Sequence, residues 1–425
     1  MLDIKLIRKN PEQCEKLLKR KVSDVSLSEI LTLDERIRNL KTESERLVSH
    51  KKTLSEKIRL AKSDPNLKIQ LIQEVDDLKE KIAFLEQQLT QTKDEFFRRM
   101  SYLPNYPEET VPVAEGKEGN IVIKSWSEKP TFNFHPLNHL ELNDKHVLFD
   151  FERTAKTTGS GWPAYRNLGA KLEWALLSFM MDKQVEHGFE LWLPPLLVKK
   201  DILFGSGQIP KFDGQYYKVE DGNQSLYLIP TAEVVLNGLH SNEIFRESEL
   251  PLTYAAFSPC FRREAGAAGA QERGLVRVHQ FHKIEMFAFT TPEQNQIIFD
   301  KMLATAEDIL ISLGLHYQLS LLSTGDMSFT ACRTIDVEVW LPGQSRYYEV
   351  SSISNCSDYQ ARRSNIRYKD QDNRLHFAHT LNGSGLATPR LMVALLENNQ
   401  TVDGSIIIPQ VLRKYLNGME RIEIL

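Results

Sequence analysis

The chain is poor in cysteine and has no long apolar run. Only four cysteines, Cys14, Cys260, Cys332 and Cys356, occur in 425 residues, and no two have C-x-x-C spacing. This scarcity argues against a disulfide framework or a cysteine zinc site and predicts a reducing, cytoplasmic environment. No stretch of about 18 apolar residues is present, which argues against a membrane-spanning helix. The first five residues lack the apolar core of a signal peptide.

Several motifs of common chemistry are also missing. No G-x-x-x-x-G-K-[ST] loop occurs, so ATP would need another phosphate cradle. The 11 histidines form no H-E-x-x-H pattern, and the grouping of His279, His282 and Glu285 is weak as a zinc site. The formal net charge of -4 gives no general attraction to nucleic acid, so such a partner would need a local basic patch.

Residues from about 27 to 98 carry two series with coiled-coil spacing. Apolar or small residues alternate three and four positions apart from Ile30 to Ala61, and again from Leu71 to Phe96. This spacing keeps one stripe facing a partner helix. Residues 62–66 form a turn and helix-start signal between the series. The pattern predicts an antiparallel two-helix coiled-coil arm, roughly 50 Å long at the rise of an α-helix.

Charge is unevenly shared between the two expected helices. The end of the first carries six basic residues and a single acid, Glu56, whereas the second is richer in acids. The basic residues are Arg46, Lys51, Lys52, Lys57, Arg59 and Lys62. One interpretation is a solvated coiled coil with ion pairs between the helices, and the other is a basic face for a phosphate backbone.

The pattern breaks after Phe97, where proline, glycine and glutamate become frequent up to Asn120. We therefore expect an N-terminal domain of residues 1–105, a linker of residues 106–120 and a larger domain of residues 121–425. Helical patterns in the larger domain cover residues 169–187, 292–313 and 387–399. Strand-like runs cover residues 226–229, 255–261, 275–289, 334–340 and 346–352. Because the strands cluster, the sequence predicts an α+β fold with an antiparallel sheet flanked by helices.

A charged hairpin is the first candidate site. Arg262 and Glu264 end one strand-like run, and alternate residues of a strand share a face. The returning run would place four more side chains together: Arg277, His279, Phe281 and Glu285. An arginine fork suits a phosphate and an aromatic ring suits a base, so the hairpin is typical of a nucleotide site. The alternative is a solvated sheet face with ion pairs.

Three further segments combine polar groups or glycine. The glycine-rich segment 380–390 leads into a helix, and its Gly383-x-Gly385 resembles a dinucleotide loop only weakly, because Thr388 replaces the third glycine. The segments 231–233 and 349–352 each place a carboxylate near hydroxyl groups. Alone, either is typical of a strand end or a helix cap.

Together these segments resemble the seryl-tRNA synthetases, which are class II aminoacyl-tRNA synthetases. Residues 188–195 resemble motif 1, which forms the dimer interface; residues 261–264 with Phe281 resemble motif 2; and residues 383–390 resemble motif 3. Residues 204–212 also resemble the seryl enzymes. Such motifs are short, but their order, with the arm ahead of them, is specific.

The resemblance implies an ATP site with Mg²⁺. It assigns Arg262 to the α-phosphate and Arg390 to the γ-phosphate as catalytic side chains, Glu264 to the adenine amino group and Phe281 to stacking on the base. Glu349 and Ser352 would coordinate Mg²⁺. The implied ATP-binding set is Arg262, Arg263, Glu264, Phe281, Glu349, Val350, Ser351, Ser352 and Arg390. In a regular strand Glu349 and Ser352 point to opposite faces, so either the strand bulges or ends there, or Ser351 takes the role.

The resemblance also implies a serine site and RNA partners. Thr231 and Glu233 would hold the amino group of L-serine, and Glu285 would accept a hydrogen bond from its hydroxyl. The implied serine-binding set is Thr231, Ala232, Glu233, Glu285, Thr380 and Ser384. The six basic residues of the arm would contact tRNA(Ser) and also tRNA(Sec). The expected assembly is a homodimer without zinc or membrane attachment.

Competing hypotheses are a non-catalytic relative, a coiled-coil scaffold with an unrelated domain, and an enzyme that loads serine onto a carrier protein. A non-catalytic relative would be expected to lack Arg262, Glu264 or Arg390, and all three are present. A carrier protein offers no distant phosphate backbone for a basic arm. The sequence therefore favours an enzyme that charges tRNA with serine.

Overall fold

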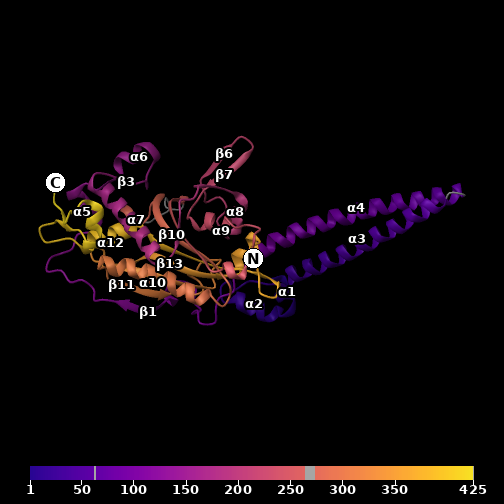
Figure 1. Ribbon diagram of the computed structural model, residues 1–425, viewed down its shortest axis with the longest axis horizontal. Coiled ribbons are helices and arrows are strands. Elements are labelled where there is room, and N and C mark those ends of the chain that lie inside the picture. Colours follow the sequence, from indigo (N-terminus) through magenta and orange to yellow (C-terminus); the bar gives the residue numbers. More distant parts are fainter. Residues whose placement is uncertain (62–63, 264–272, 425) are drawn as a thin grey trace. The chain divides into compact units, whose positions relative to one another are not determined.

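The computed structural model describes residues 1–61, 64–263 and 273–424, so Lys62 and Glu264 lie outside the described residues. The chain divides into two compact units, one of Leu2–Pro104 and one of Asn105–Leu425 together with Met1 (Figure 1). No described helix combines the length and the apolar character needed to cross a membrane.

The first unit is helical. Its elements are α1 (Ile4–Lys9), α2 (Pro11–Lys19), α3 (Ser28–Leu60) and α4 (Pro65–Ser101). Figure 1 shows α3 and α4 side by side as a long hairpin. Leu54, Val75 and Leu78 form its buried seam, and every residue of the predicted series is buried or half-buried. The predicted two-helix coiled-coil arm is confirmed. The side chain of Asp64 accepts a hydrogen bond from the Leu67 N–H at 3.0 Å and thereby caps α4.

A buried acid in this unit is not evident from the heptad pattern. Asp34 of α3 is not one of the predicted apolar positions, yet its side chain is buried. It accepts a hydrogen bond from Arg38 Nε at 3.2 Å and forms an ion pair with Arg8 Nε of α1 at 3.0 Å. Two guanidinium groups therefore compensate the buried charge and fasten α1 to the base of α3.

The second unit is a mixed α and β domain. Its α-helices are α5 (His139–His146), α6 (Glu152–Thr158), α7 (Leu168–Glu186), α8 (Lys200–Gly205), α9 (Glu233–Gly238), α10 (Asn295–Leu313), α11 (Tyr359–Ser364), α12 (Thr388–Asn398) and α13 (Gln410–Arg413). Its strands are β1 (Ile121–Trp126), β2 (Phe149–Asp150), β3 (Ala164–Tyr165), β4 (Glu190–Trp192), β5 (Leu197–Lys199), β6 (Lys218–Asp221), β7 (Gln224–Leu228), β8 (Ile244–Arg246), β9 (Leu252–Phe261), β10 (Gln280–Thr290), β11 (Tyr317–Leu321), β12 (Arg333–Leu341), β13 (Arg346–Ser357), β14 (Arg367–Lys369), β15 (Leu375–Phe377), β16 (His379–Ala387), β17 (Ile406–Ile407) and β18 (Arg421–Ile422).

An eight-stranded sheet forms the centre of this unit, in the order β1-β11-β12-β13-β16-β10-β9-β4. Neighbouring strands are antiparallel except β4, which runs parallel to β9 at one edge. The predicted antiparallel α+β fold is confirmed. Helices α7, α10 and α12 pack with the sheet in one large apolar core.

Strand β10 shows how the two faces of the sheet differ. Ile284, Met286 and Ala288 point into the large core. The alternate residues Lys283 and Glu285 point to the opposite face, which carries the polar cavities described below. Further along the strand, the same face becomes apolar and joins a smaller core. Because side chains alternate along a strand, the polar site lies on the face of the sheet opposite the large apolar core.

The structure corrects one segment of the sequence prediction and confirms another. Residues 275–289 are not one strand, because a 3-10 turn (η4, Gly274–Val276) precedes β10. The glycine-rich segment leads into a helix as predicted, because β16 near the centre of the sheet is followed directly by α12. A Cβ at Gly383 would lie 2.7 Å from Cγ1 of Ile353, and one at Gly385 would lie 2.3 Å from Nε2 of Gln184. Gly383 therefore permits close packing against the neighbouring strand β13, and Gly385 permits close packing against helix α7.

The expected linker, residues 106–120, belongs to the second unit. Val111 is buried with Leu322 and Met327. The side-chain amide of Asn105 donates hydrogen bonds to the carbonyl oxygens of Thr330 and Cys356, both at 2.8 Å. The residue directly before the segment is thus fixed by polar contacts, and Val111 within the segment by burial.

Candidate functional site

Two adjoining cavities lie on the polar face of the sheet. The first has a volume of about 120 Å³ and the second about 380 Å³. Both are lined by Arg262, Lys283, Glu349 and Ser384. Ligands bound in the two cavities would therefore meet beside two cationic side chains, Arg262 and Lys283, and the carboxylate of Glu349.

The first cavity is cationic and partly aromatic. Arg262, Arg277 and Arg390 line it together with the ring of Phe281. Arg262 follows the last residue of β9 and Phe281 is the second residue of β10, so the antiparallel pairing brings them together. The guanidinium carbon of Arg262 lies 5.1 Å from the centre of that ring. Such a wall suits a phosphate beside a planar base.

Arg390 is held in a fixed direction at the start of α12. Its Nη1 donates to the carbonyl oxygen of Glu349 at 2.8 Å and lies 3.3 Å from the carboxylate of the same residue. Its Nε donates to the carbonyl oxygen of Val276 at 3.2 Å. These contacts connect motif 3 to β13 and to η4, the turn that precedes β10 and is called the motif 2 turn below, and they orient the guanidinium before any ligand arrives.

A bulge in β13 resolves the parity of Glu349 and Ser352. Val337 of β12 pairs with Ser351, but the next residue, Glu338, pairs with Glu349, so Val350 is the extra residue. Glu349 and Ser352 consequently line the same second cavity. The Ser351 hydroxyl instead donates to the carbonyl oxygen of Ser384 at 2.6 Å. The bulge expected as one alternative is confirmed.

Glu349, which lines both cavities, and Ser352, which lines the second, supply a carboxylate and a hydroxyl. Magnesium keeps several waters and binds proteins through one or two carboxylates plus substrate phosphates, so this small oxygen set fits it. Across residues 1–61, 64–263 and 273–424, no cluster of three or more His, Cys, Asp or Glu side chains could hold a metal ion alone. A cation here would accordingly depend on oxygen atoms of the ligand.

The second cavity contains a buried ion pair. Lys283 and Glu285 pair along β10, and both side chains are almost inaccessible to solvent. The Lys283 ammonium also donates to Thr231 Oγ1 at 2.8 Å. Because a charge in such a site needs partners, Lys283 holds both Glu285 and Thr231 in place.

A chain of buried amide and hydroxyl groups positions Glu233. Gln360 donates to the Glu233 carboxylate at 2.6 Å, and the Thr380 hydroxyl donates to Gln360 Oε1 at 2.7 Å. Thr380 thus lies behind Gln360 and outside the residues that line the cavity. Burial and the nearby negative charge of Glu285 raise the pKa of Glu233 to about 7. A cationic ligand group would restore the charged form.

The remaining candidate residues lie at different depths. Ala232 and Ser351 are fully buried and line neither cavity. Val350 lines the first cavity, whereas Arg263 is exposed and donates to the Gly214 carbonyl oxygen at 2.9 Å. His279 turns away from its predicted face, stacks on Trp162 at 5.3 Å and interacts with the Arg262 carbonyl oxygen at 2.8 Å.

Sequence reasoning missed three residues of the site. Lys283 has the same strand parity as Phe281 and Glu285, so alternation alone could have found it. Asp336 pairs across the strands with Ser352, and burial with the nearby Glu349 carboxylate raises its pKa well above the usual range. Gln360 lies on α11, and no local pattern marked it.

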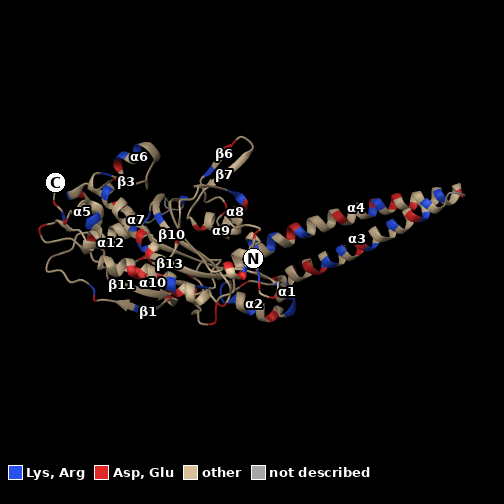
Figure 2. Cartoon of the chain, viewed as in Figure 1, with Lys and Arg blue, Asp and Glu red and all other residues tan. Residues whose placement is uncertain are grey.

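The arm carries a separate candidate surface. Arg46, Lys52, Lys57 and Arg59 are exposed and Lys51 is half-buried. Within the described part of the arm, these five residues make no ion pair with an acidic side chain. Figure 2 shows acids on both helices, but from Arg46 to the end of α3 the basic residues are accompanied by a single acid, Glu56. The solvated-coil interpretation, which needs ion pairs between the helices, explains this stretch poorly.

Comparison with known proteins identifies the class. Residues 217–399 match the tRNA synthetase class II core domain (G, H, P, S and T). With its antiparallel sheet, the second unit is the core of a class II aminoacyl-tRNA synthetase. Residues 1–107 match the seryl-tRNA synthetase N-terminal domain. The chain belongs to the seryl-tRNA synthetase family, which confirms the resemblance seen in the sequence.

Full-length relatives support this membership. The chain is 63% identical over 420 residues to a serine–tRNA ligase of Chlamydia pneumoniae, covering 99% of this chain and 98% of the relative. It is 64% identical to that of Chlamydia abortus, covering 99% of both. The crystal structure of seryl-tRNA synthetase from Pyrococcus horikoshii complexed with ATP superposes with a TM-score of 0.92 at 36% identity over 100% of both chains. The chain is therefore an enzyme, a serine–tRNA ligase.

Proposed function

We propose that the chain activates L-serine with ATP, forming seryl-adenylate and pyrophosphate, and then transfers serine to the 3′ end of tRNA(Ser). The observation that carries this proposal is the junction of the two cavities at Arg262. A cationic, partly aromatic cavity and an adjoining polar cavity with two buried acids suit a nucleotide and an amino acid whose reacting groups meet. The related enzyme from Pyrococcus horikoshii was solved with ATP.

In this proposal ATP occupies the first cavity. Arg262 binds the α-phosphate, Arg390 the γ-phosphate, and Phe281 stacks on adenine. Glu264, which lies outside the described residues, contacts the adenine amino group. The exposed Arg263 has no cavity contact and takes an outer position. Val350 and Ser351 act through the bulge, because it turns Glu349 toward the ligand.

Magnesium, when bound, offsets the negative charge of the phosphate oxygens. Glu349 and Ser352 are the side chains that would hold it together with ATP. The ion pair between Arg390 and Glu349, whose atoms lie 3.3 Å apart, keeps that carboxylate at the junction of the cavities. The protein itself supplies the cationic groups Arg262 and Arg390.

L-Serine occupies the second cavity. Glu233 and Thr231 bind its ammonium group, and Glu285 accepts a hydrogen bond from its hydroxyl. Ser384 lines the cavity, whereas Ala232 and Thr380 support it from behind. If alanine entered, Glu285 would lose that partner, and sites of this kind reject the wrong substrate by about 10⁴-fold.

The chemistry needs no nucleophile from the protein. A carboxylate oxygen of serine attacks the α-phosphorus, the bond to the β-phosphate oxygen breaks, and pyrophosphate leaves. Arg262 and Arg390 stabilise the charge that develops on the phosphoryl oxygens. A terminal ribose hydroxyl of the tRNA then loses its proton and attacks the seryl carbonyl carbon. AMP leaves and the ester remains.

The arm is proposed to bind the tRNA backbone through its basic residues, with little direct reading of bases. Lys62 belongs to this set but lies outside the described residues. The same phosphate contacts would serve tRNA(Sec), which we propose as a second substrate. Serine attachment to tRNA(Sec) transcripts tests this, and its absence beside normal tRNA(Ser) charging would contradict it.

A homodimer is proposed from the region that resembles motif 1. Edge strand β4 is followed by Leu193, which is 79% exposed, and Trp174 of α7 is 59% exposed. Exposed apolar groups near an unpaired sheet edge are typical of an interface. Leu193→Asp is expected to weaken dimerisation at least tenfold in sedimentation velocity, and Val402→Asp, at another exposed apolar position, is not. A wild-type monomer would contradict the proposal.

The proposed activity predicts pyrophosphate exchange into ATP that depends on serine. Exchange with serine should exceed exchange with alanine by about 10⁴-fold, because alanine leaves Glu285 without its partner. Threonine must be excluded by cavity shape. Glu285→Ala should remove most of the preference for serine over alanine. Equal exchange with serine and alanine, or none with any amino acid, would refute the proposal.

A further inference from the structure

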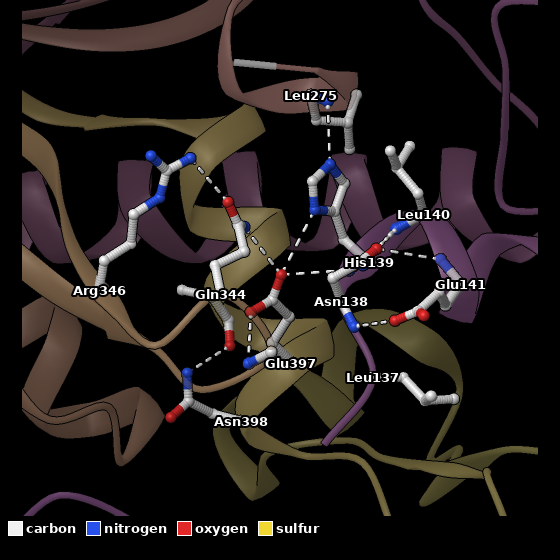
Figure 3. Close-up of polar contacts among 12 residues, drawn as sticks. Leu137, Asn138, His139, Leu140, Glu141, Leu275, Gln344, Arg346, Glu397 and Asn398 are labelled. Carbon is white, nitrogen blue, oxygen red and sulfur yellow. Dashed lines mark hydrogen bonds and ion pairs between the residues drawn. The ribbon is translucent and has the colours of Figure 1, made fainter. Parts of the chain in front are cut away.

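A buried carboxylate of α12 contacts both helix α5 and the turn between β12 and β13. Glu397, near the end of α12, has no exposed surface. It accepts hydrogen bonds from the Gly343 N–H at 3.0 Å, from Gln344 Nε2 at 3.0 Å and from the His139 N–H at 3.1 Å. Its carboxylate also lies 3.3 Å from His139 Nδ1 (Figure 3). Four donors thus compensate one buried charge.

The other nitrogen of His139 reaches the wall of the first cavity. The N–H of Leu275, in the η4 turn, donates to His139 Nε2 at 3.3 Å (Figure 3). A carboxylate can only accept, so Nδ1 carries the proton facing Glu397 and Nε2 remains an acceptor for Leu275. The two contacts therefore require the same tautomer and reinforce each other.

The η4 turn is shaped to receive this imidazole. Gly274 has a positive φ of 72°, and a Cβ there would lie 2.2 Å from His139 Nε2. A glycine satisfies both the backbone conformation and the close approach. From Leu275 to Val278 the chain lines the first cavity, so a shift of the turn would move the cavity wall.

Helix α12 holds this turn at two places. Arg390 binds the Val276 carbonyl oxygen directly, as described above. Glu397 lies two helical turns further along, on the same side of the helix, and acts through His139. One rigid helix thus fixes both a proposed phosphate ligand and the backbone of the opposite wall.

We infer that His139 is a positioning residue for the nucleotide, acting through the Leu275 N–H on the motif 2 turn. This inference rests on the proposed placement of ATP in the first cavity. A purely structural pair of His139 and Glu397 would need only the Nδ1 contact. The contact from Leu275, in the cavity wall, to Nε2 therefore distinguishes a positioning role from a purely structural one.

Two substitutions can remove the two contacts one at a time. The side-chain amide of asparagine takes the position of Nδ1, and that of glutamine takes the position of Nε2. His139→Asn keeps a donor for Glu397 and loses the acceptor for Leu275. His139→Gln keeps the acceptor and loses the donor. In the exchange assay, His139→Asn should raise the KM for ATP about tenfold, the effect of one lost hydrogen bond, with kcat and the KM for serine within about twofold. His139→Gln should leave the KM for ATP within about twofold while lowering the Tm.

His146 provides a matched control on the same helix. It is buried like His139, but its ring nitrogens face the carbonyl oxygens of Gly404 and Glu423, at 2.8 and 3.1 Å, away from both cavities. His146→Asn should lower the Tm and leave the KM for ATP unchanged. Equal KM values for ATP in both His139 variants would overturn the inference. If the wild-type enzyme showed no serine-dependent exchange, the proposed function itself would fail first.

Discussion

Replacing Arg262 with alanine is expected to lower kcat/KM for serine-dependent pyrophosphate exchange by about 10³-fold. Arg262 lines both cavities and lies over the ring of Phe281. It can therefore contact the α-phosphate both in bound ATP and in the transition state. Lysine offers one compact charge in place of a planar fork, and Arg262→Lys should recover no more than about tenfold.

Stability measurements separate this effect from misfolding. Among residues 1–61, 64–263 and 273–424, the side chain of Arg262 makes one long hydrogen bond, from Nε to the Pro230 carbonyl oxygen at 3.4 Å, so Arg262→Ala should change the Tm little. Arg246→Ala serves as a control because this exposed arginine pairs with Glu249 at 3.2 Å and lines neither cavity. Exchange by Arg262→Ala within tenfold of the wild type would contradict the assigned role.

Reversing three charges of the arm is expected to separate the two half-reactions. The variant Lys52→Glu, Lys57→Glu and Arg59→Glu should lower kcat/KM for tRNA(Ser) charging at least a hundredfold, because phosphate contacts become repulsive. Pyrophosphate exchange should stay within about twofold, since the cavities belong to the other unit. Charging should also lose part of its dependence on salt concentration, which a titration between about 50 and 200 mM salt would show.

A second triple variant controls for total charge. Lys5→Glu, Lys9→Glu and Lys16→Glu changes the net charge equally at exposed positions outside the basic run. Its charging should remain near the wild-type rate. Deletion of residues 30–97 is the more drastic test and should abolish charging while sparing exchange. Normal charging by either the deletion or the first triple variant would rule out the arm as the tRNA contact.

Local patterns predicted the arm and the order of the motifs well. In a helix, the side chains of one stripe point to one partner, so the spacing of Leu54, Val75 and Leu78 was sufficient to predict burial. Asp34 was not predictable in this way, because its burial depends on Arg8 of another helix. The parity of β10 likewise predicted Phe281 and Glu285 on one face and, applied fully, would have included Lys283.

Contacts between distant segments decided the rest. The bulge at Val350 follows from pairing with β12, and the burial of Thr380 follows from Gln360, which belongs to α11. Nothing near His139 in the sequence marks Glu397 or Leu275 as its partners. Pairing of this kind depends on how strands and helices pack, which no short window of sequence contains.

The sequence alone thus determined the antiparallel coiled-coil arm, the α+β class and the family, because periodicity and ordered motifs are properties of short segments. Only the tertiary structure decided that Ser352 joins Glu349 in one cavity, that Lys283 holds Glu285, and that His139 reaches the motif 2 turn. Each of these depends on a hydrogen bond or ion pair between groups brought together by the eight-stranded sheet and its helices. These contacts form only when the apolar core has folded and holds the sheet and its helices in place.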